Sequence, residues 1–240
     1  MKLTHDLTAS PKGIFSESAT QETDLGAKIV TDDGSVYRYV KAGGTTLVIG
    51  TLLDGPATIA THTNMAVVLG TAGATAITVT LGAVAITANQ YAGGYVVVND
   101  EAGEGYSYRI KSHPAADALA ALIITLEEDE KIQTALTTSS EVTLIANQYN
   151  GVVIHAQTEA GVPVGVATYP ITTLYYGWIK TRGVTAVLND NAPPEIGECA
   201  AASTTTDGCV TEGTGPLGVV GFALAQGVST EKNPVFLTID

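Results

Sequence analysis

Histidine is the side chain best suited to acid–base and metal chemistry near neutral pH, and this chain contains four. They are His5, His62, His113 and His155, and none lies three or four residues from another, so no helical pair of metal ligands is present. His113 and Asp117 would form a catalytic triad only if the fold brought a serine to them, because no G-x-S-x-G nucleophile motif occurs. We therefore interpret the histidines as exposed or hydrogen-bonded residues of turns, and we predict no catalytic residue and no metal.

Two further motifs have the form of ligand sites but lie in the wrong context. Gly213–Gly218 reads GTGPLG and matches the dinucleotide pattern, yet no apolar strand leads into it and a strand is expected where a helix must follow. The acidic run Glu127–Glu130 has consecutive carboxylates, whereas calcium loops space them around a glycine. We therefore predict that the glycine motif binds no cofactor and that the acidic run is a solvated turn. A β-sandwich hydrolase stays a minor alternative, since the separation of two catalytic carboxylates is spatial.

The two cysteines lie on either side of a small, polar, turn-forming segment. Cys199 and Cys209 flank AAASTTTDG and are placed to bridge the base of a hairpin, but cytosolic synthesis keeps thiols reduced. The sequence is therefore compatible both with a disulfide and with two free thiols. No further ligand lies nearby to complete a zinc site.

Composition limits the class of protein and its partners. Of the 240 residues 45% are hydrophobic, which is enough for a real core, and only 15% are charged, which disfavours long surface helices. The formal net charge is −13 and Lys and Arg do not cluster, so we expect neither nucleic acid nor an anionic membrane as a partner. We find no secretory signal and no apolar run long enough for a transmembrane helix.

Short β-branched runs separated by turn residues dominate the chain. The segment AKIVTDDGSVYRYVKAG alternates on both sides of Asp33-Gly34, which predicts a hairpin. Residues 115–124 fit a helix or a strand, and we predict a strand. Residues 172–190 are predicted to form a hairpin with a turn near Thr181–Gly183. Turn signals recur at short intervals throughout, which favours an all-β sandwich or barrel built from hairpins.

The clearest internal regularity is a repeated phrase. Ala-Asn-Gln-Tyr begins at Ala88 and again at Ala146, and the aligned copies also share one Gly and a Glu-Ala-Gly triplet. Glycine permits tight turns and β-branched residues favour strands, so we predict a duplicated hairpin, an internal two-fold repeat. The predicted organisation is an extended N-terminal arm at residues 1–25, a β-rich region at 26–170 containing the hairpin units 88–114 and 146–170, and a C-terminal β region at 171–240 with a Cys-bearing loop at 192–216.

Aromatic side chains gather in two of the predicted hairpins. They belong either to the core or barrel rim, or to a protein–protein contact, where Tyr and Trp are enriched. Phe15 is the one large apolar side chain that we single out in the arm, as a possible anchor. The interface residues predicted in this way are Phe15, Tyr37, Tyr39, Tyr175, Tyr176 and Trp178.

Three segments together resemble the capsid decoration, or cement, proteins of tailed bacteriophages. They are LGAKIVTDDGSVYRYVKAGGTTLVIGTLL, YYGWIKTRGVTAVL and the ending GFALAQGVSTEKNPVFLTID, which cover about the N-terminal quarter and the final third. The resemblance implies a β-rich homotrimer, made in the host cytoplasm, that bridges major capsid subunits on the outer face of the shell. It implies no enzymatic activity. Departures from the family are the loop at 192–216 and the duplicated centre.

Two hypotheses follow from that resemblance. The first is that the N-terminal arm of a decoration protein clamps a neighbouring subunit. The second is that the chain is another virion component, either a major capsid protein or a tail or fibre module. A major capsid protein usually has a long helix and a basic inner face, and neither is predicted here.

Overall fold

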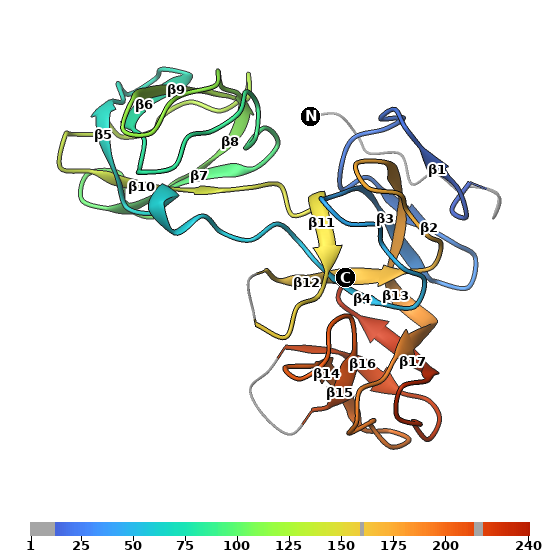
Figure 1. Cartoon of the computed structure of the whole chain (residues 1–240). Helices are drawn as coiled ribbons and strands as arrows, with labels where there is room; N and C mark the ends of the chain where they lie inside the picture. The colour runs from blue at the N-terminus through green and yellow to red at the C-terminus, as the bar shows by residue number, and fades with distance from the viewer. Residues whose placement is uncertain (1–12, 159–160, 214–217) are drawn as a thin grey trace. The chain divides into compact units, whose positions relative to one another are not determined.

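The structure is a computed structural model that describes residues 13–158, 161–213 and 218–240 (Figure 1). Among these residues the one helical element is the 3-10 turn η1 (Ala60–His62), and strands β1 to β17 supply all other regular structure, so the all-β prediction is confirmed. The chain divides into two compact units. We call Thr58–Asn147 the inserted unit, because it interrupts the split unit, which comprises residues up to 57 and from 148 onward.

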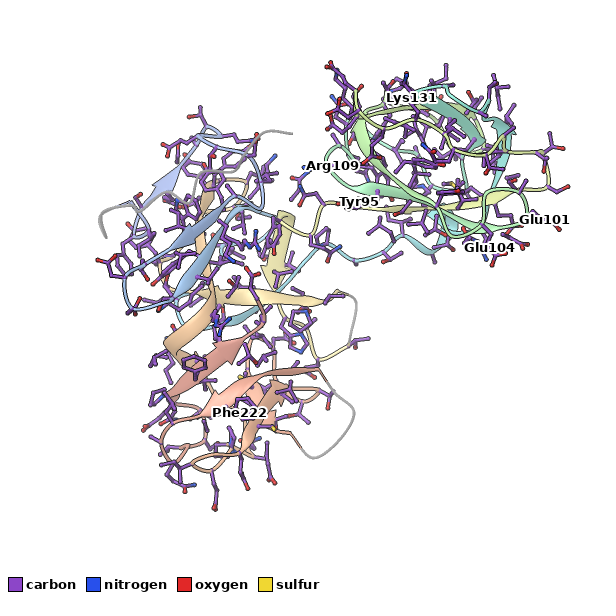
Figure 2. The ribbon with its side chains drawn as sticks, turned by 180° about the vertical axis from the view of Figure 1, so that it is seen from behind. Tyr95, Glu101, Glu104, Arg109, Lys131 and Phe222 are labelled. Carbon is purple, nitrogen blue, oxygen red and sulfur yellow. The ribbon has the colours of Figure 1, made fainter. Side chains whose placement is uncertain are left out.

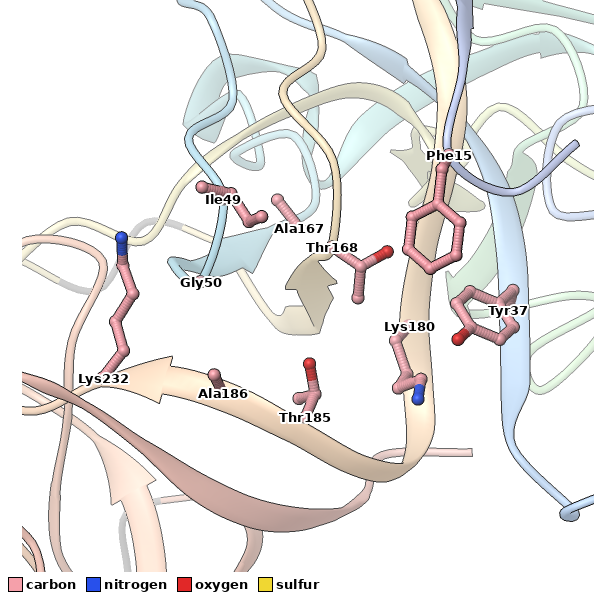
Figure 3. A pocket seen from close by; sticks show the side chains of 10 residues that line it. All are labelled: Phe15, Tyr37, Ile49, Gly50, Ala167, Thr168, Lys180, Thr185, Ala186 and Lys232. Atoms are coloured by element: carbon pink, nitrogen blue, oxygen red, sulfur yellow. The ribbon is translucent and has the colours of Figure 1, made fainter. Parts of the chain in front are cut away.

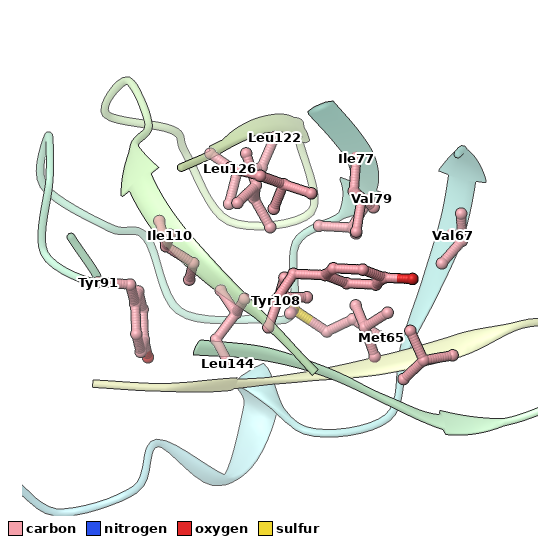
Figure 4. Packing of buried hydrophobic residues seen from close by; sticks show 14 of the residues in the cluster. Met65, Val67, Ile77, Val79, Tyr91, Tyr108, Ile110, Leu122, Leu126 and Leu144 are labelled. Atoms are coloured by element: carbon pink, nitrogen blue, oxygen red, sulfur yellow. The ribbon is translucent and has the colours of Figure 1, made fainter. Parts of the chain in front are cut away.

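The inserted unit is a closed antiparallel barrel. Its strands pair in the order β10-β5-β6-β9-β8-β7, and β7 pairs again with β10, so no strand edge is left open. Buried apolar side chains from every strand fill the interior (Figure 4). The strands are β5 (Met65–Leu69), β6 (Ala76–Thr80), β7 (Tyr95–Asp100), β8 (Ser107–Ser112), β9 (Ala121–Leu126) and β10 (Glu141–Ile145).

Alternation along the barrel strands explains which side chains are inside. In β9 the side chains of Leu122 and Ile124 are fully buried, while Ile123 between them is 54% exposed. Strand β9 also decides the ambiguous segment 115–124 in favour of the predicted strand, although it begins only at Ala121. Gly94 allows the barrel to close, because a Cβ there would lie 2.1 Å from the carbonyl oxygen of Ile145.

The split unit contains a second ring of strands. β13 pairs with β12, β12 with β4, β4 with β11, β11 with β3 and β3 with β13, around a core of nine buried residues. β17, β16, β14 and β15 extend the sheet from β13 over a second core. The strands are β1 (Glu17–Ser18), β2 (Lys28–Val30), β3 (Val36–Ala42), β4 (Leu52–Asp54), β11 (Asn150–Ile154), β12 (Pro163–Ala167), β13 (Tyr176–Leu188), β14 (Cys199–Ala202), β15 (Val210–Glu212), β16 (Val219–Ala223) and β17 (Lys232–Thr238).

Strand β13 corrects the prediction of a hairpin with its turn near Thr181–Gly183. The chain continues through this point as one strand of 13 residues, and its register against β3 shifts between Lys180 and Arg182. Gly183 adopts a φ of +98°, which is available to glycine at little cost and lets the strand take an irregularity without reversing. The first half of β13 pairs with β3 and the second half with β17.

The two copies of the repeated phrase have different structures. The first copy forms the predicted hairpin, because β7 and β8 pair directly. In the second copy β11 and β12 do not pair with each other, since each pairs with an opposite side of β4. The duplicated hairpin is therefore found in the first copy only. The boundary between the units also divides the second copy, after Asn147.

The described part of the N-terminal arm, residues 13–25, packs on its own unit. Ile14 is 3% exposed and joins a buried cluster with Tyr39 and Trp178. β1 pairs with β13, and the backbone N–H of Glu22 donates to the Tyr39 hydroxyl oxygen at 3.0 Å. Residues 1–12 lie outside the described residues, so the clamp stays a prediction.

Residues 192–216 contain a hairpin where a loop was predicted. β14 and β15 pair with Ala200 opposite Glu212 and Ala202 opposite Val210. This register puts Cys199 and Cys209 at opposite ends of the hairpin, about 13 Å apart along the strand direction. A disulfide needs Cα atoms within roughly 7 Å, and both cysteines are free thiols. The disulfide that the sequence left open is therefore not formed.

Candidate binding site

Two of the four histidines form hydrogen bonds at one end of the inserted barrel. His62 Nδ1 lies 2.6 Å from the Tyr91 hydroxyl and its Nε2 lies 2.8 Å from the carbonyl oxygen of Val84. His113 Nε2 accepts the backbone N–H of Tyr91 at 3.0 Å, and its Nδ1 contacts the Pro114 carbonyl oxygen at 2.8 Å. Burial lowers the pKa of His113 and raises the pKa of Tyr91 to about 12. These imidazoles are structural, since each ring nitrogen already has a partner.

His155 lies in the split unit among groups that resemble a catalytic triad in composition only. Its Nδ1 lies 2.8 Å from Asp54 Oδ2, and its Nε2 lies 2.9 Å from the backbone carbonyl oxygen of Ser203. The Ser203 hydroxyl instead donates to Asp190 Oδ2 at 2.6 Å. A triad needs the hydroxyl on the imidazole, so this serine is not activated. The network ties the ends of β4 and β11 to the β14–β15 turn.

The structure separates the predicted interface residues into core and surface. Tyr37, Tyr39 and Trp178 are 5%, 1% and 8% exposed, because residues 13–27 cover this face of β3 and β13. They are core residues of the split unit, which was the other interpretation of their clustering. Tyr176 is half-buried and stacks on Tyr39 with 6.1 Å between ring centroids. The two exposed members of the predicted set are Phe15 and Tyr175.

A pocket of about 400 Å³ opens on the split unit (Figure 3). Side chains from the segments before β1 and β4 and from β3, β13 and β17 surround it, together with the end of β12. Its size is within the range of roughly 300–1,000 Å³ that is usual for ligand sites. The lining residues that define its chemistry are Phe15, Tyr37, Ile49, Thr168, Lys180 and Lys232.

Lys180 is the unusual group of this pocket, because it is a cation that is only 8% exposed. Its Nζ donates to the Val184 carbonyl oxygen at 2.9 Å and to Ser35 Oγ at 3.3 Å, and it lies 5.1 Å from the centre of the Tyr37 ring. These partners are neutral, and no ion pair between described residues includes Lys180. Burial lowers its pKa. The Asp33 carboxylate opposes this lowering of the pKa, and its Oδ2 accepts the Ser35 hydroxyl at 2.9 Å, so Lys180 reaches an anion only through Ser35.

The rest of the pocket wall is apolar or hydroxylated. The Lys232 stem lies over Gly50, where a Cβ would lie 2.7 Å from Lys232 Cδ. Thr168 Oγ1 is buried and has no hydrogen-bond partner among the described residues. Among the described residues, no acidic one lines the pocket. An apolar space with two lysines can accept an apolar group together with an anion.

A second surface feature lies across β13, β17 and β16, and we call it the apolar ladder. Val184 is opposite Phe236, and Phe236 is opposite Phe222, so the three side chains form one row on the sheet. They are 52%, 36% and 43% exposed, and Phe222 is seen in Figure 2. Sequence reasoning missed this row, although the outward apolar residues of the last two strands were its signal. This contiguous exposed apolar row is a candidate interaction surface.

The remaining motifs supply no site. The acidic run is a turn in which Glu128 Oε1 pairs with Lys111 Nζ at 2.6 Å, and residues 214–217 of the glycine motif lie outside the described residues. In the part of the chain that the structure describes, no three His, Cys, Asp or Glu residues are grouped to hold a metal ion. That part also has no helix with the length and apolar character needed to cross a membrane.

No protein-family model, curated protein or solved structure matches this chain.

Proposed function

We propose that this chain is a structural virion protein that binds the outer face of a tailed-phage capsid and stabilises the shell by bridging major capsid subunits. The observation that carries the proposal is the apolar ladder of Val184, Phe236 and Phe222, which remains exposed although both units have filled cores. Side chains fill the interior of the inserted barrel, and we place the shell contact on the exposed surface of the split unit. The three segments that resemble decoration proteins supply the identity of the partner.

The charge of the chain and the form of its sheets also support an external, structural role. The net charge of −13 disfavours contact with packaged nucleic acid, since such contact needs clustered cations. The inserted barrel is closed and therefore has no strand edge that would recruit further copies without control. We propose that the active form is a homotrimer made in the host cytoplasm. Light scattering on the purified protein tests this, and a mass near three times 24.6 kDa is expected.

Binding to shells tests the proposed function directly. Shells assembled from the major capsid protein of the same genome, without this protein, are mixed with wild type or with a Phe222→Ser, Phe236→Ser double variant. We expect wild type to co-sediment with the shells and to raise their melting temperature. The double variant should bind at least about tenfold more weakly, because it removes two exposed aromatic anchors.

A matched control comes from the inserted unit. Ile123→Ser removes a side chain of comparable exposure, 54%, and should leave shell binding unchanged. Failure of the wild type to bind shells, or equal binding by the double variant, contradicts the proposal.

A further inference from the structure

We propose that the pocket of the split unit binds an apolar side chain adjacent to a carboxylate, both presented by a segment of the partner protein. This deepens the proposed function, and it rests on that function only in taking the partner to be the shell protein. The pocket residues that carry the inference are Phe15, Ile49, Lys180 and Lys232.

Charge complementarity identifies the polar half of the ligand. Acidic residues outnumber basic ones by 24 to 11 in the chain, yet the described residues that line the pocket include two lysines and no acidic residue. Lys180 Nζ has three N–H donors, of which Val184 and Ser35 occupy two, so one remains for a ligand. A ligand carboxylate would give this buried cation a direct ion pair, which Asp33 does not supply because it is linked to Lys180 only through Ser35 Oγ.

The walls and rim identify the apolar half and its source. Phe15 and Ile49 are 49% and 46% exposed, and Val48, which precedes Ile49 in the chain, is 45% exposed, so apolar surface is exposed at the pocket mouth. A small ligand would fill the pocket and leave this rim in water. A protein segment covers the rim as it runs on either side of the inserted side chain, which favours a segment as the occupant.

The site is built before any ligand arrives. Lys180 is fixed by its two hydrogen bonds and by the Tyr37 ring, whereas Lys232 is exposed at the mouth of the pocket. Fixed groups lose little conformational freedom on binding, which favours affinity. The occupant therefore needs only to match the shape and charge that are already present.

Peptide binding to the whole chain tests the inference without any shell. The ¹⁵N-labelled protein is titrated with the capped peptide Ac-Gly-Phe-Asp-Gly-NH₂ and with its Asn counterpart, while the amide signals of Thr168 and Ala186 are followed by NMR. We expect saturable shifts with the Asp peptide and about tenfold weaker binding of the Asn peptide, because a charge-assisted hydrogen bond is lost.

Two variants locate the effect. Lys180→Met should abolish the preference for the Asp peptide, and Lys232→Gln at the exposed mouth gives the same test if the first variant does not fold. Lys41→Gln is the matched control, since Lys41 also lies over an aromatic ring, 5.6 Å from the centre of Tyr176, but does not line the pocket. It should bind both peptides like wild type.

Several results would overturn the inference. They are the absence of shifts at the pocket amides at millimolar peptide, equal affinity for the two peptides, tighter binding of phenylacetate than of the Asp peptide, or self-association that Lys180→Met abolishes. Shell binding separates this inference from the proposed function. If wild type does not bind shells, the proposed function fails while the peptide titration still decides the pocket. If Lys232→Gln and wild type bind shells equally, the pocket is not the shell contact.

Discussion

Leu122→Ala should destabilise the inserted unit and leave the split unit unchanged. Leu122 is fully buried in the barrel and lies opposite Val79 in the sheet, so its truncation leaves a cavity that closed, hydrogen-bonded strands cannot collapse to fill. Leucine-to-alanine substitutions at such sites cost about 2–5 kcal/mol of unfolding free energy, and we take ~3 kcal/mol. The inserted unit, Thr58–Asn147, is of a size for which each kcal/mol lowers the melting temperature by roughly 4–8 °C. We therefore expect a fall of about 12–24 °C.

The single tryptophan provides an assay that distinguishes the units. Trp178 belongs to the split unit and is 8% exposed, so its fluorescence reports unfolding of that unit. Calorimetry of Leu122→Ala should show one transition at lower temperature, while the fluorescence transition stays where it is in wild type. Leu53→Ala is the control, because Leu53 is fully buried in the core of the split unit, and it should move the fluorescence transition instead.

Two outcomes would refute this reasoning. A calorimetric shift below about 4 °C would mean that the barrel interior is not closely packed at Leu122. Equal movement of the calorimetric and fluorescence transitions would mean that the units unfold as one cooperative body.

Three further predictions concern glycines, acid and thiols. Gly82→Ala should destabilise the inserted unit strongly, because the new Cβ would lie 1.7 Å from the backbone oxygen of Thr61. Gly44→Ala is the control, because a Cβ there meets nothing within 4 Å, and it should be neutral or stabilising by up to about 1 kcal/mol. Thermal melts of the two variants and wild type measure the difference. Acid should destabilise the inserted unit, because burial holds the pKa of His113 below its ordinary 6.5. The stability associated with neutral His113 is fully present above pH 6.5 and is lost as the pH falls. In a calorimetric pH series, the melting temperature of His113→Gln should depend less on pH than that of wild type. Cys199 should react with a thiol reagent in the native protein and Cys209 only after unfolding, because Cys209 is 1% exposed and burial raises its pKa; two thiols titrated in denaturant confirm that no disulfide exists.

Local features of the fold could be predicted from the sequence. The hairpin at Asp33-Gly34 forms as expected, with Gly34 at a φ of +77° and Asp33 accepting hydrogen bonds from Thr31 and Ser35. Strand β8 follows the same local rule, since Tyr108 and Ile110 are buried while Ser107 and Arg109 are exposed. Turn geometry and the two-residue period of strands depend only on neighbouring residues, so both can be predicted from the sequence.

The candidate site could not be predicted in the same way. Phe15 was singled out as an anchor, and it lines the pocket, but Lys180 and Lys232 drew no notice because isolated lysines usually lie on the surface. The pocket exists only because segments distant in the sequence meet around β13.

By itself, the sequence determined the all-β class and the inward and outward faces of individual strands, because both follow from local residue types and spacing. Tertiary structure alone decided which strands pair. It placed β4 between β11 and β12, joined Asp54 to His155 across 101 residues of chain, and kept β13 continuous through Gly183. Pairing between distant strands depends on competition among many similar apolar segments for the same partners, and the packing of the whole unit resolves that competition.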